Sequence, residues 1–466
     1  MAPRSPGLLT TVLAAAMSLA APLAHAAPRP LGVNVHQSTD IGLDATRDAG
    51  LGWVRIDLNW LDVEPAPGAY DWTLIDTVVD NAKARGLSVL AVIAYGPSWA
   101  SEGDVMGDGP VNDVPSPGTY ATFVTAAVQH LMGRVTHYEV WNEPNLEVFF
   151  EGSPADYLDR VLIPGADAIH AACSSCLVVG PGLASVGGQY DVWMDAVLGA
   201  AKDKIDIISG HAYAGFPAPS STVGMTSDSF FNKIESHRVL TYDGNILWEG
   251  PLSFREVMLK HGVQKPFWLT ETGREASPSD ITALDEQRTY YRHVLEAMLT
   301  RPWWEATIFY EGFDNAGFTW GIATPDTAAP SGYQPKPVMS LLQKVTASQP
   351  LFGGTGNDCD DGLDNEGDGQ VDHPADPDCA SLSGSSEGLP PVDAGAGGSG
   401  GGNGGNGGSG NGGAPASGGA GGGGDERDPG GCACDATGRG GSPGLALAAL
   451  ALGLAIARAR SRRASG

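Results

Sequence analysis

The chain has 466 residues, and its 66 glycines are too many for a single globular fold, so the composition indicates more than one kind of segment. The formal net charge is -27 at pH 7. A phosphate backbone would be repelled by this charge rather than neutralised, which excludes a nucleic-acid partner and leaves uncharged ligands open.

Residues 1–27 have the pattern of a secretory signal peptide. Arg4 supplies the positive start, an apolar stretch follows at residues 8–23, and Ala24-His25-Ala26 is a small-x-small cleavage site. The apolar stretch is short for a transmembrane anchor, which is the alternative interpretation. Export permits disulfides, so we expect the six cysteines to form pairs rather than a cytosolic metal or redox site.

Between residue 31 and about residue 348, strand-like apolar runs alternate with amphipathic helical segments, of which 72–85 and 120–132 are the clearest. This alternation is typical of parallel strands joined by crossover helices. The expected strands are residues 31–36, 53–58, 88–95, 136–141, 176–180, 205–211, 267–270 and 306–310. Eight such units in one domain, residues 28–350, predict an α/β fold of the (β/α)8 TIM-barrel type. A doubly wound sheet is the alternative.

Two glutamates stand where the fourth and seventh expected strands end. In a barrel the active site collects at the carboxyl ends of the strands. Pro144 disfavours the helical region for the residue before it, so we expect Glu143 to close an extended strand and to point into a cleft, as Glu271 does on strand seven. Paired carboxylates suit glycosidic bond cleavage, because one donates a proton to the leaving oxygen and the other stabilises or attacks the anomeric carbon. Either glutamate alone could instead be a salt-bridge partner.

Polar and aromatic residues accompany the two glutamates at the expected strand ends, and aromatic faces suit the apolar faces of sugar rings. The candidates for substrate contact are Asn34, His36, Arg55, Trp99, Asn142, His211, Tyr213, Tyr310 and Trp320, with Glu311 beside them on the eighth strand. Packing in the core is the alternative for the tryptophans, for Tyr310 and for His211, and Arg55 could simply bridge barrel carboxylates.

Three short motifs together resemble clan A glycoside hydrolases: WNEPN at 141–145, HAY at 211–213 and TET at 270–272. The opening motif at 55–72 looks most like glycoside hydrolase family 39 and related bacterial endoglycosidases that cut exopolysaccharide. The likeness covers residues 31–348. It implies a (β/α)8 barrel and a retaining double displacement on a β-linked polysaccharide or oligosaccharide, with no cofactor for catalysis.

The resemblance also implies roles for individual residues. Glu143 matches the acid/base and Glu271 the nucleophile, while Asn142 matches the asparagine that hydrogen bonds the sugar 2-hydroxyl. Arg55 and Tyr213 match residues that flank the nucleophile and hold it ionised, and His211 matches a substrate-contacting position. Like-charge repulsion from Glu271 is expected to keep the proton on Glu143. A catalytically silent carbohydrate-binding or adhesion protein on the same scaffold is the second hypothesis.

Two cysteine-bearing segments suggest structural rather than chemical roles. Cys173 and Cys176 are expected to form a tight disulfide or to stay reduced, and no thioredoxin-like unit surrounds them. Residues 355–382 form an acidic module that Cys359 and Cys379 would close as a disulfide. The module resembles the calcium loops of EF-hand and thrombospondin-type repeats, and a solvated acidic spacer is the alternative. Its expected calcium ligands are Asp364, Glu366, Asp368 and Asp372.

The C-terminal part of the chain has the composition of a tether followed by a sorting signal. Residues 383–431 are dominated by glycine and are expected to be a disordered linker. Residues 432–466 combine a Cys-Ala-Cys motif, a short apolar helix and a basic end, and they resemble the myxobacterial C-terminal sorting tail. We therefore expect an exported monomer attached to the membrane or cell surface, or released from it. The long segments 100–116 and 214–244 leave open which sugar is bound and whether cleavage is internal or terminal.

Overall fold

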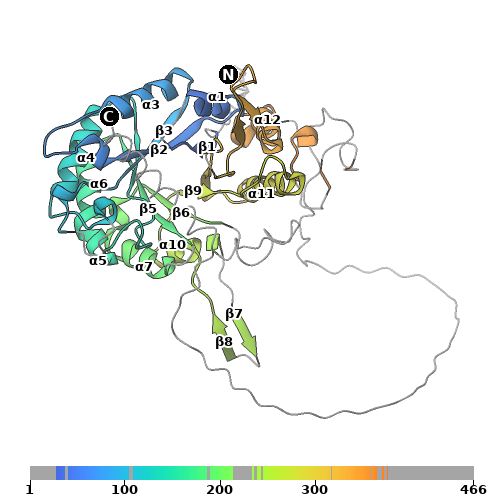
Figure 1. The fold of residues 1–466 in the computed structure, drawn as a ribbon. Coiled ribbons are helices and arrows are strands. Elements are labelled where there is room, and N and C mark those ends of the chain that lie inside the picture. Colours follow the sequence, from blue (N-terminus) through green and yellow to red (C-terminus); the bar gives the residue numbers. More distant parts are fainter. Residues whose placement is uncertain are drawn as a thin grey trace, which may run out of the picture.

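A computed structural model of the chain describes residues 28–36, 40–103, 109–185, 189–213, 233–235, 239–242, 245–315, 317–356, 358–364, 370, 371 and 375. Eight parallel strands close into a barrel in the order β1-β10-β9-β6-β5-β4-β3-β2. The barrel strands are β1 (Leu31–Asn34), β2 (Trp53–Asn59), β3 (Ser88–Ala94), β4 (His137–Val140), β5 (Leu177–Ala184), β6 (Ile207–His211), β9 (Phe267–Thr272) and β10 (Trp304–Phe309). The predicted (β/α)8 barrel is confirmed, and Figure 1 shows the helices arranged around the strands.

The sequence predicted bounds for two helices, 72–85 and 120–132, and the corresponding α3 and α4 begin and end within two residues of them. The helices are α1 (Asp40–Asp48), α2 (Trp60–Val63), α3 (Thr73–Ala84), α4 (Thr119–His130), α5 (Pro154–Tyr157), α6 (Ile163–Ala172), α7 (Tyr190–Ala201), α10 (Phe254–Lys260), α11 (Ile281–Leu299) and α12 (Pro337–Ser348), with a π-helical turn at Leu158–Leu162. Helix α3 buries Ile75, Val78, Val79 and Ala82, the apolar face expected from their spacing. A capping box of Ser253 and Glu256 starts α10.

Two short antiparallel hairpins were not predicted. The pair β7 (Val239–Tyr242) and β8 (Asn245–Glu249) lies between β6 and β9; β7 falls at the end of the long segment 214–244, and β8 follows it directly. An Asp-Gly dipeptide between two apolar runs is a hairpin signal that could have revealed it. The pair β11 (Ala323–Pro325) and β12 (Tyr333–Pro335) follows β10.

The barrel interior changes from apolar to charged along its axis. On β2, residues 54, 56 and 58 pack into the main core, so Trp53, Arg55 and Asp57 face the opposite side, the barrel interior. Trp53 contacts Trp268 and His137 edge-on at ring-centroid distances of 5.1 and 4.8 Å, which makes an apolar floor. Arg55 lies one layer above this floor, and the carboxyl ends of the strands lie above Arg55.

The start of the acidic module packs against the barrel. Lys344 on α12 donates to Asp360 at 2.8 Å, and Cys359 and Leu363 are fully buried. Cys359 is disulfide-bonded, and its expected partner Cys379 lies outside the described residues. The described part of the module is therefore continuous with the barrel surface.

Several sequence predictions fall outside the part of the chain that the structure describes: the signal peptide, the linker, the sorting tail and the expected calcium ligands Glu366, Asp368 and Asp372. Within the described part, no helix combines the length and the apolar character needed to cross a bilayer. Cys173 and Cys176 form a disulfide, one of the two expected states.

Candidate active site

The backbone around Glu143 differs from the predicted one. Strand β4 ends at Val140, and both Trp141 and Glu143 have positive φ, at 69° and 44°. The prediction that Glu143 closes an extended strand is therefore wrong. Pro144 disfavours the right-handed helical region, but it leaves the left-handed region open. Such a conformation costs a non-glycine residue on the order of 1–3 kcal/mol, and surrounding structure must hold it.

Backbone hydrogen bonds from neighbouring strands hold this turn. The Glu143 amide donates to Gly182 O at 3.0 Å, and the Trp141 amide donates to Ile93 O at 3.1 Å. The Trp141 indole, fully buried, donates to Phe149 O at 2.8 Å. The strands on both sides of β4 thus aim the Glu143 side chain.

The two glutamates meet around His211 at the carboxyl ends of β4, β6 and β9. One ligand atom from each of Glu143, His211 and Glu271 lies within 4.8 Å of the other two. His211 Nδ1 is 2.8 Å from Glu143 Oε1 and 3.5 Å from Glu271 Oε2. His211 and Glu271 are register partners on β6 and β9, which brings these distant residues together.

Arg55 orients Glu271 from below. Its Nη1 donates to Glu271 Oε1 at 2.7 Å and to Asn34 Oδ1 at 2.7 Å, and its Nη2 donates to Asn142 Oδ1 at 2.8 Å. The Tyr213 hydroxyl donates to Glu271 Oε2 at 3.0 Å. Both oxygens of Glu271 therefore accept hydrogen bonds from fixed donors, which holds the carboxylate in one orientation.

Glu143 and His211 both favour their neutral forms. Burial raises the pKa of Glu143 to about 8; Arg55 opposes this rise, and the charge of Glu139 adds to it. Repulsion from Glu271 was the expected cause of the retained proton, whereas in the structure burial and the charge of Glu139 raise the pKa of Glu143. Burial lowers the pKa of His211 to about 4, so this imidazole is neutral at pH 7. Its Nε2 is buried with no partner among the described residues.

A second group of predicted residues lies beside Glu271. His36 Nδ1 is 2.6 Å from Asp57 Oδ2, and its ring lies 5.3 Å from that of Tyr310. Trp320 contacts the rings of Tyr310 and Tyr213 at 6.0 and 5.7 Å. Burial alone would lower the pKa of His36, but the charge and hydrogen bond of Asp57, helped by nearby carboxylates, raise it to about 9. These aromatic rings and a charged imidazole share one side of the site.

Trp99 lies in a different cluster from the other predicted site residues. Its indole donates to Glu64 O at 3.1 Å, and its ring contacts Trp60 edge-on at 5.8 Å. Glu64 in turn accepts from the Trp60 indole at 2.8 Å. Trp99 thus belongs to the wall built by the loops after β2 and β3.

Two acidic residues that the sequence did not single out, Asp57 and Glu139, belong to the same constellation, together with Glu311, which was expected beside the substrate-contact candidates. Burial raises the pKa of Glu311 to about 7, against the opposing effect of His36. Their positions within the strands could have identified Asp57 and Glu139 from the sequence. Both alternate with core residues and therefore face the barrel interior. A charged residue facing that interior requires a buried partner.

Metal binding fits this constellation poorly. Glu143, His211 and Glu271 offer three ligand atoms, the only such group found among the described residues. Arg55 already occupies Glu271 Oε1, and its buried positive charge would oppose a cation at the same place. The charge of Arg55 therefore makes the cluster a poor cation site. Of the expected calcium ligands, only Asp364 is described, and its amide donates to Glu296 Oε1 at 3.0 Å.

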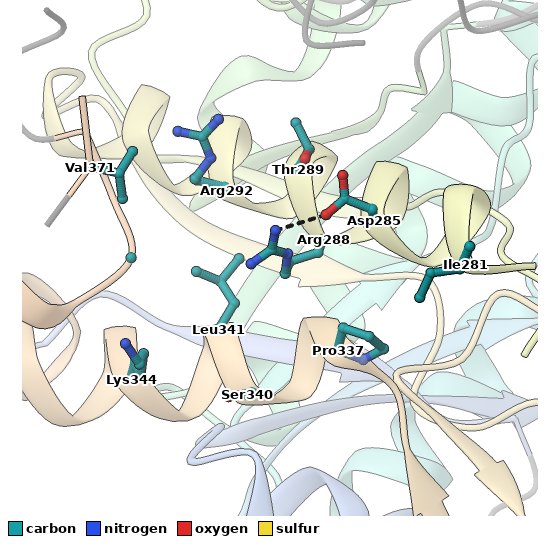
Figure 2. A pocket seen from close by; sticks show the side chains of 11 residues that line it. Ile281, Asp285, Arg288, Thr289, Arg292, Pro337, Ser340, Leu341, Lys344 and Val371 are labelled. Carbon is teal, nitrogen blue, oxygen red and sulfur yellow. Dashed lines mark hydrogen bonds and ion pairs between the residues drawn. The ribbon is translucent and has the colours of Figure 1, made fainter. Parts of the chain in front are cut away.

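A pocket of about 700 Å³ lies away from these carboxylates, between α11 and α12 (Figure 2). Arg288 in its wall is paired with Asp285 at 2.7 Å, as the dashed line in Figure 2 shows. Lys344 is paired with Asp360. Because these cations are already neutralised, we assign no ligand to this pocket.

The fold and the site together define a (β/α)8 barrel with paired glutamates at its carboxyl face. No family model matches the chain. A family 39 glycoside hydrolase from the gut symbiont Bacteroides cellulosilyticus WH2 is similar in structure, with 21% identity and a TM-score of 0.51 over 68% of this chain. The chain spans 63% of the length of that protein.

Two further solved structures are similar over a comparable part of the chain. A monomeric beta-xylosidase from Caulobacter crescentus CB15 has 19% identity and a TM-score of 0.49, covering 70% of this chain and 70% of that one. The GH39 enzyme from Xanthomonas axonopodis pv. citri has 18% identity and a TM-score of 0.49, covering 69% of this chain and 68% of that one. The likeness to the Bacteroides protein, at 21% identity, shows the fold alone.

Proposed function

We propose that the chain is a retaining glycoside hydrolase that cleaves a β-linked polysaccharide. The observation that carries the proposal is the meeting of Glu143 and Glu271, whose nearest carboxyl oxygens lie within 4.8 Å in different surroundings. Retention needs carboxyl groups about 5–5.5 Å apart, while inversion needs about 6.5–9.5 Å to admit a water. The fold shared with a family 39 glycoside hydrolase supports the same function.

In the first step Glu143 acts as the acid and Glu271 as the nucleophile. With a pKa of about 8, Glu143 carries a proton at neutral pH and donates it to the leaving glycosidic oxygen. Glu271, oriented by Arg55 and Tyr213, attacks the anomeric carbon and forms a glycosyl ester.

In the second step the same carboxyl groups release the sugar. Glu143, now a carboxylate, takes a proton from a water that attacks the anomeric carbon, and the ester bond to Glu271 breaks. Two inversions give net retention, and both residues return to their starting states.

The surrounding side chains supply substrate contacts in this proposal. Asn142 directs its amide oxygen to Arg55, which leaves its NH₂ group available for the sugar 2-hydroxyl. His36 and His211 each have a buried Nε2 with no partner among the described residues, suited to sugar hydroxyls. Tyr310 and Trp320 offer aromatic faces beside them.

The test is release of reducing ends from a panel of β-glycans. Glu143→Ala and Glu271→Ala should each abolish most activity, while Glu147→Ala, an exposed glutamate on the same β4 loop, should retain it. Azide should rescue both variants, giving a β-glycosyl azide with Glu143→Ala and an α-glycosyl azide with Glu271→Ala. Binding of the glycans without turnover by the wild type would instead support a carbohydrate-binding protein.

We also propose that the protein is exported and attached to the cell surface, and that the acidic module binds calcium. The support is the sequence of residues 1–27, 355–382 and 432–466. Cell fractionation after deletion of residues 432–466 tests attachment, since an unchanged surface fraction would contradict it. Calorimetry of the full chain, with Glu366→Gln/Asp368→Asn as control, tests calcium binding.

A further inference from the structure

Glu139 is the most enclosed charge in the barrel, and the catalytic steps above do not use it. It lies on β4 with no exposed surface, one layer below the reacting carboxylates. Its Oε2 accepts from Arg55 Nε at 2.6 Å, and its Oε1 accepts from Ser209 Oγ at 2.7 Å and Thr270 Oγ1 at 2.8 Å. Three donors on β2, β6 and β9 thus hold one carboxylate in place.

We propose that Glu139 is a positioning residue: it fixes the guanidinium of Arg55, and Arg55 in turn fixes the nucleophile Glu271 and the sugar-binding Asn142. This inference rests on the proposed glycosidase function and assigns to that site a residue that does not touch the substrate.

The shape of the Arg55 guanidinium links Glu139 to Glu271 and Asn142. Its five N–H groups form a rigid planar fork. When Glu139 engages the Nε edge, the plane is set, and Nη1 and Nη2 are directed upward to Glu271 and Asn142. Without Glu139, the guanidinium could rotate toward Glu271, the other carboxylate bonded to it. A misplacement of about 1 Å at a reacting group can cost on the order of 10²-fold in rate.

The charge of Glu139 also affects the pKa of Glu143, the proposed acid. It raises the pKa of Glu143 in addition to the larger effect of burial, whereas Arg55 lowers it. The titratable groups that face Glu143 are Arg55 on β2, Tyr95 after β3, Glu139 on β4, His211 on β6, Tyr213 after β6, Glu271 on β9 and Tyr310 after β10. Removing the Glu139 charge should therefore make Glu143 lose its proton at lower pH.

A purely structural role is the competing explanation, because breaking a buried ion pair destabilises a protein in any case. Glu139→Gln separates the two explanations. We expect kcat/KM to fall on the order of 10²-fold, mainly through kcat, and the alkaline limb of the pH–rate profile to move down by about one unit. Glu305→Gln is the control, because Glu305 lies at the start of β10 and accepts from the Trp268 indole at the barrel floor.

The protonation of Glu143 can also be measured directly by NMR, without substrate turnover. The ¹³C chemical shift of the Glu143 carboxyl, assigned with Glu143→Gln, should titrate at lower pH in Glu139→Gln than in the wild type. An unchanged titration and an unchanged pH–rate profile, with only a loss of stability, would overturn the inference. A wild type without glycosidase activity would refute the proposed function, and the titration would still decide whether Glu139 acts on Glu143.

If Glu139→Gln fails to fold, a second variant still tests the positioning role of Glu139. Ser209→Ala/Thr270→Val removes two donors to Glu139 Oε1 and keeps every charge. We expect kcat to fall about tenfold with the alkaline limb in place, because Glu139 and Arg55 lose their fixed orientation. Unchanged kcat in this double variant would overturn the positioning role.

Discussion

Replacing Glu143 by glutamine should stabilise the protein at pH 8 and have little effect at pH 4.5. The folded state holds the pKa of Glu143 at about 8, against 4.5 for a free glutamate. Between these two values the folded protein binds a proton that the unfolded chain has released, so the stability of the wild type falls as pH rises. Glutamine keeps the shape of the protonated side chain and does not titrate.

The size of the effect follows from the pKa difference. A difference of about 3.5 units, at 1.36 kcal/mol per unit, corresponds to about 5 kcal/mol at pH 8. For a domain of this size 1 kcal/mol changes Tm by roughly 1–2 °C, so the glutamine variant should melt about 5–10 °C higher at pH 8. His211, whose pKa is lowered to about 4, also makes stability depend on pH, but it is present in both proteins and largely cancels in the difference.

Thermal unfolding of the wild type and Glu143→Gln at half-unit steps from pH 4.5 to 8.5 measures the difference. Glu147→Gln, at an exposed position of the same loop, should show no trend. A Glu143→Gln difference that stays constant across this range would refute the assignment of a buried, protonated glutamate.

Three further results are expected. The kcat/KM of the wild type should fall above about pH 8 as Glu143 loses its proton, and a profile that stays flat to pH 9.5 would contradict its role as acid. Tyr213→Phe removes the hydroxyl that donates to Glu271 at 3.0 Å, and should lower kcat/KM about 10–100-fold with little change in Tm, measured by steady-state kinetics and calorimetry. Lys336→Met leaves Asp314 buried without its 2.7 Å ion-pair partner, and should cost about 3–5 kcal/mol in urea unfolding.

Matched variants control the last two results. Tyr120→Phe removes a buried hydroxyl that donates to Ile93 O in the core, so it should affect stability and leave kcat/KM within about twofold. Lys344→Met breaks a half-exposed pair with Asp360, which should cost at most about 1 kcal/mol. Equal losses in Lys336→Met and Lys344→Met would show that burial of the Lys336 pair does not matter.

The strand order and the two carboxylates were predictable because they depend on local patterns. Apolar runs that alternate with amphipathic segments predicted all eight barrel strands, and Glu143 and Glu271 stand just beyond or within the strands expected to carry them. The left-handed turn at Glu143 was not predictable in the same way. Hydrogen bonds to Ile93 and Gly182, on the two neighbouring strands, hold that turn.

The hydrogen bonds between Arg55 and Glu139, below the site, were likewise only partly predictable from the sequence. The sequence singled out Arg55 through a motif, but it did not single out Glu139, which is one acidic residue within a short strand. Only the barrel brings β2, β4, β6 and β9 close enough for Arg55, Ser209 and Thr270 to surround this carboxylate.

The sequence by itself determined the alternation that makes a (β/α)8 barrel and the chemical groups available at its carboxyl face. The tertiary structure decided which groups are neutral and which are paired: Glu143 with a pKa of about 8, His36 with a pKa of about 9, and Arg55 shared between Glu139 and Glu271. The physical reason is that hydrophobic periodicity is a property of neighbouring residues, whereas desolvation and Coulomb interactions depend on distances between strands far apart in the chain.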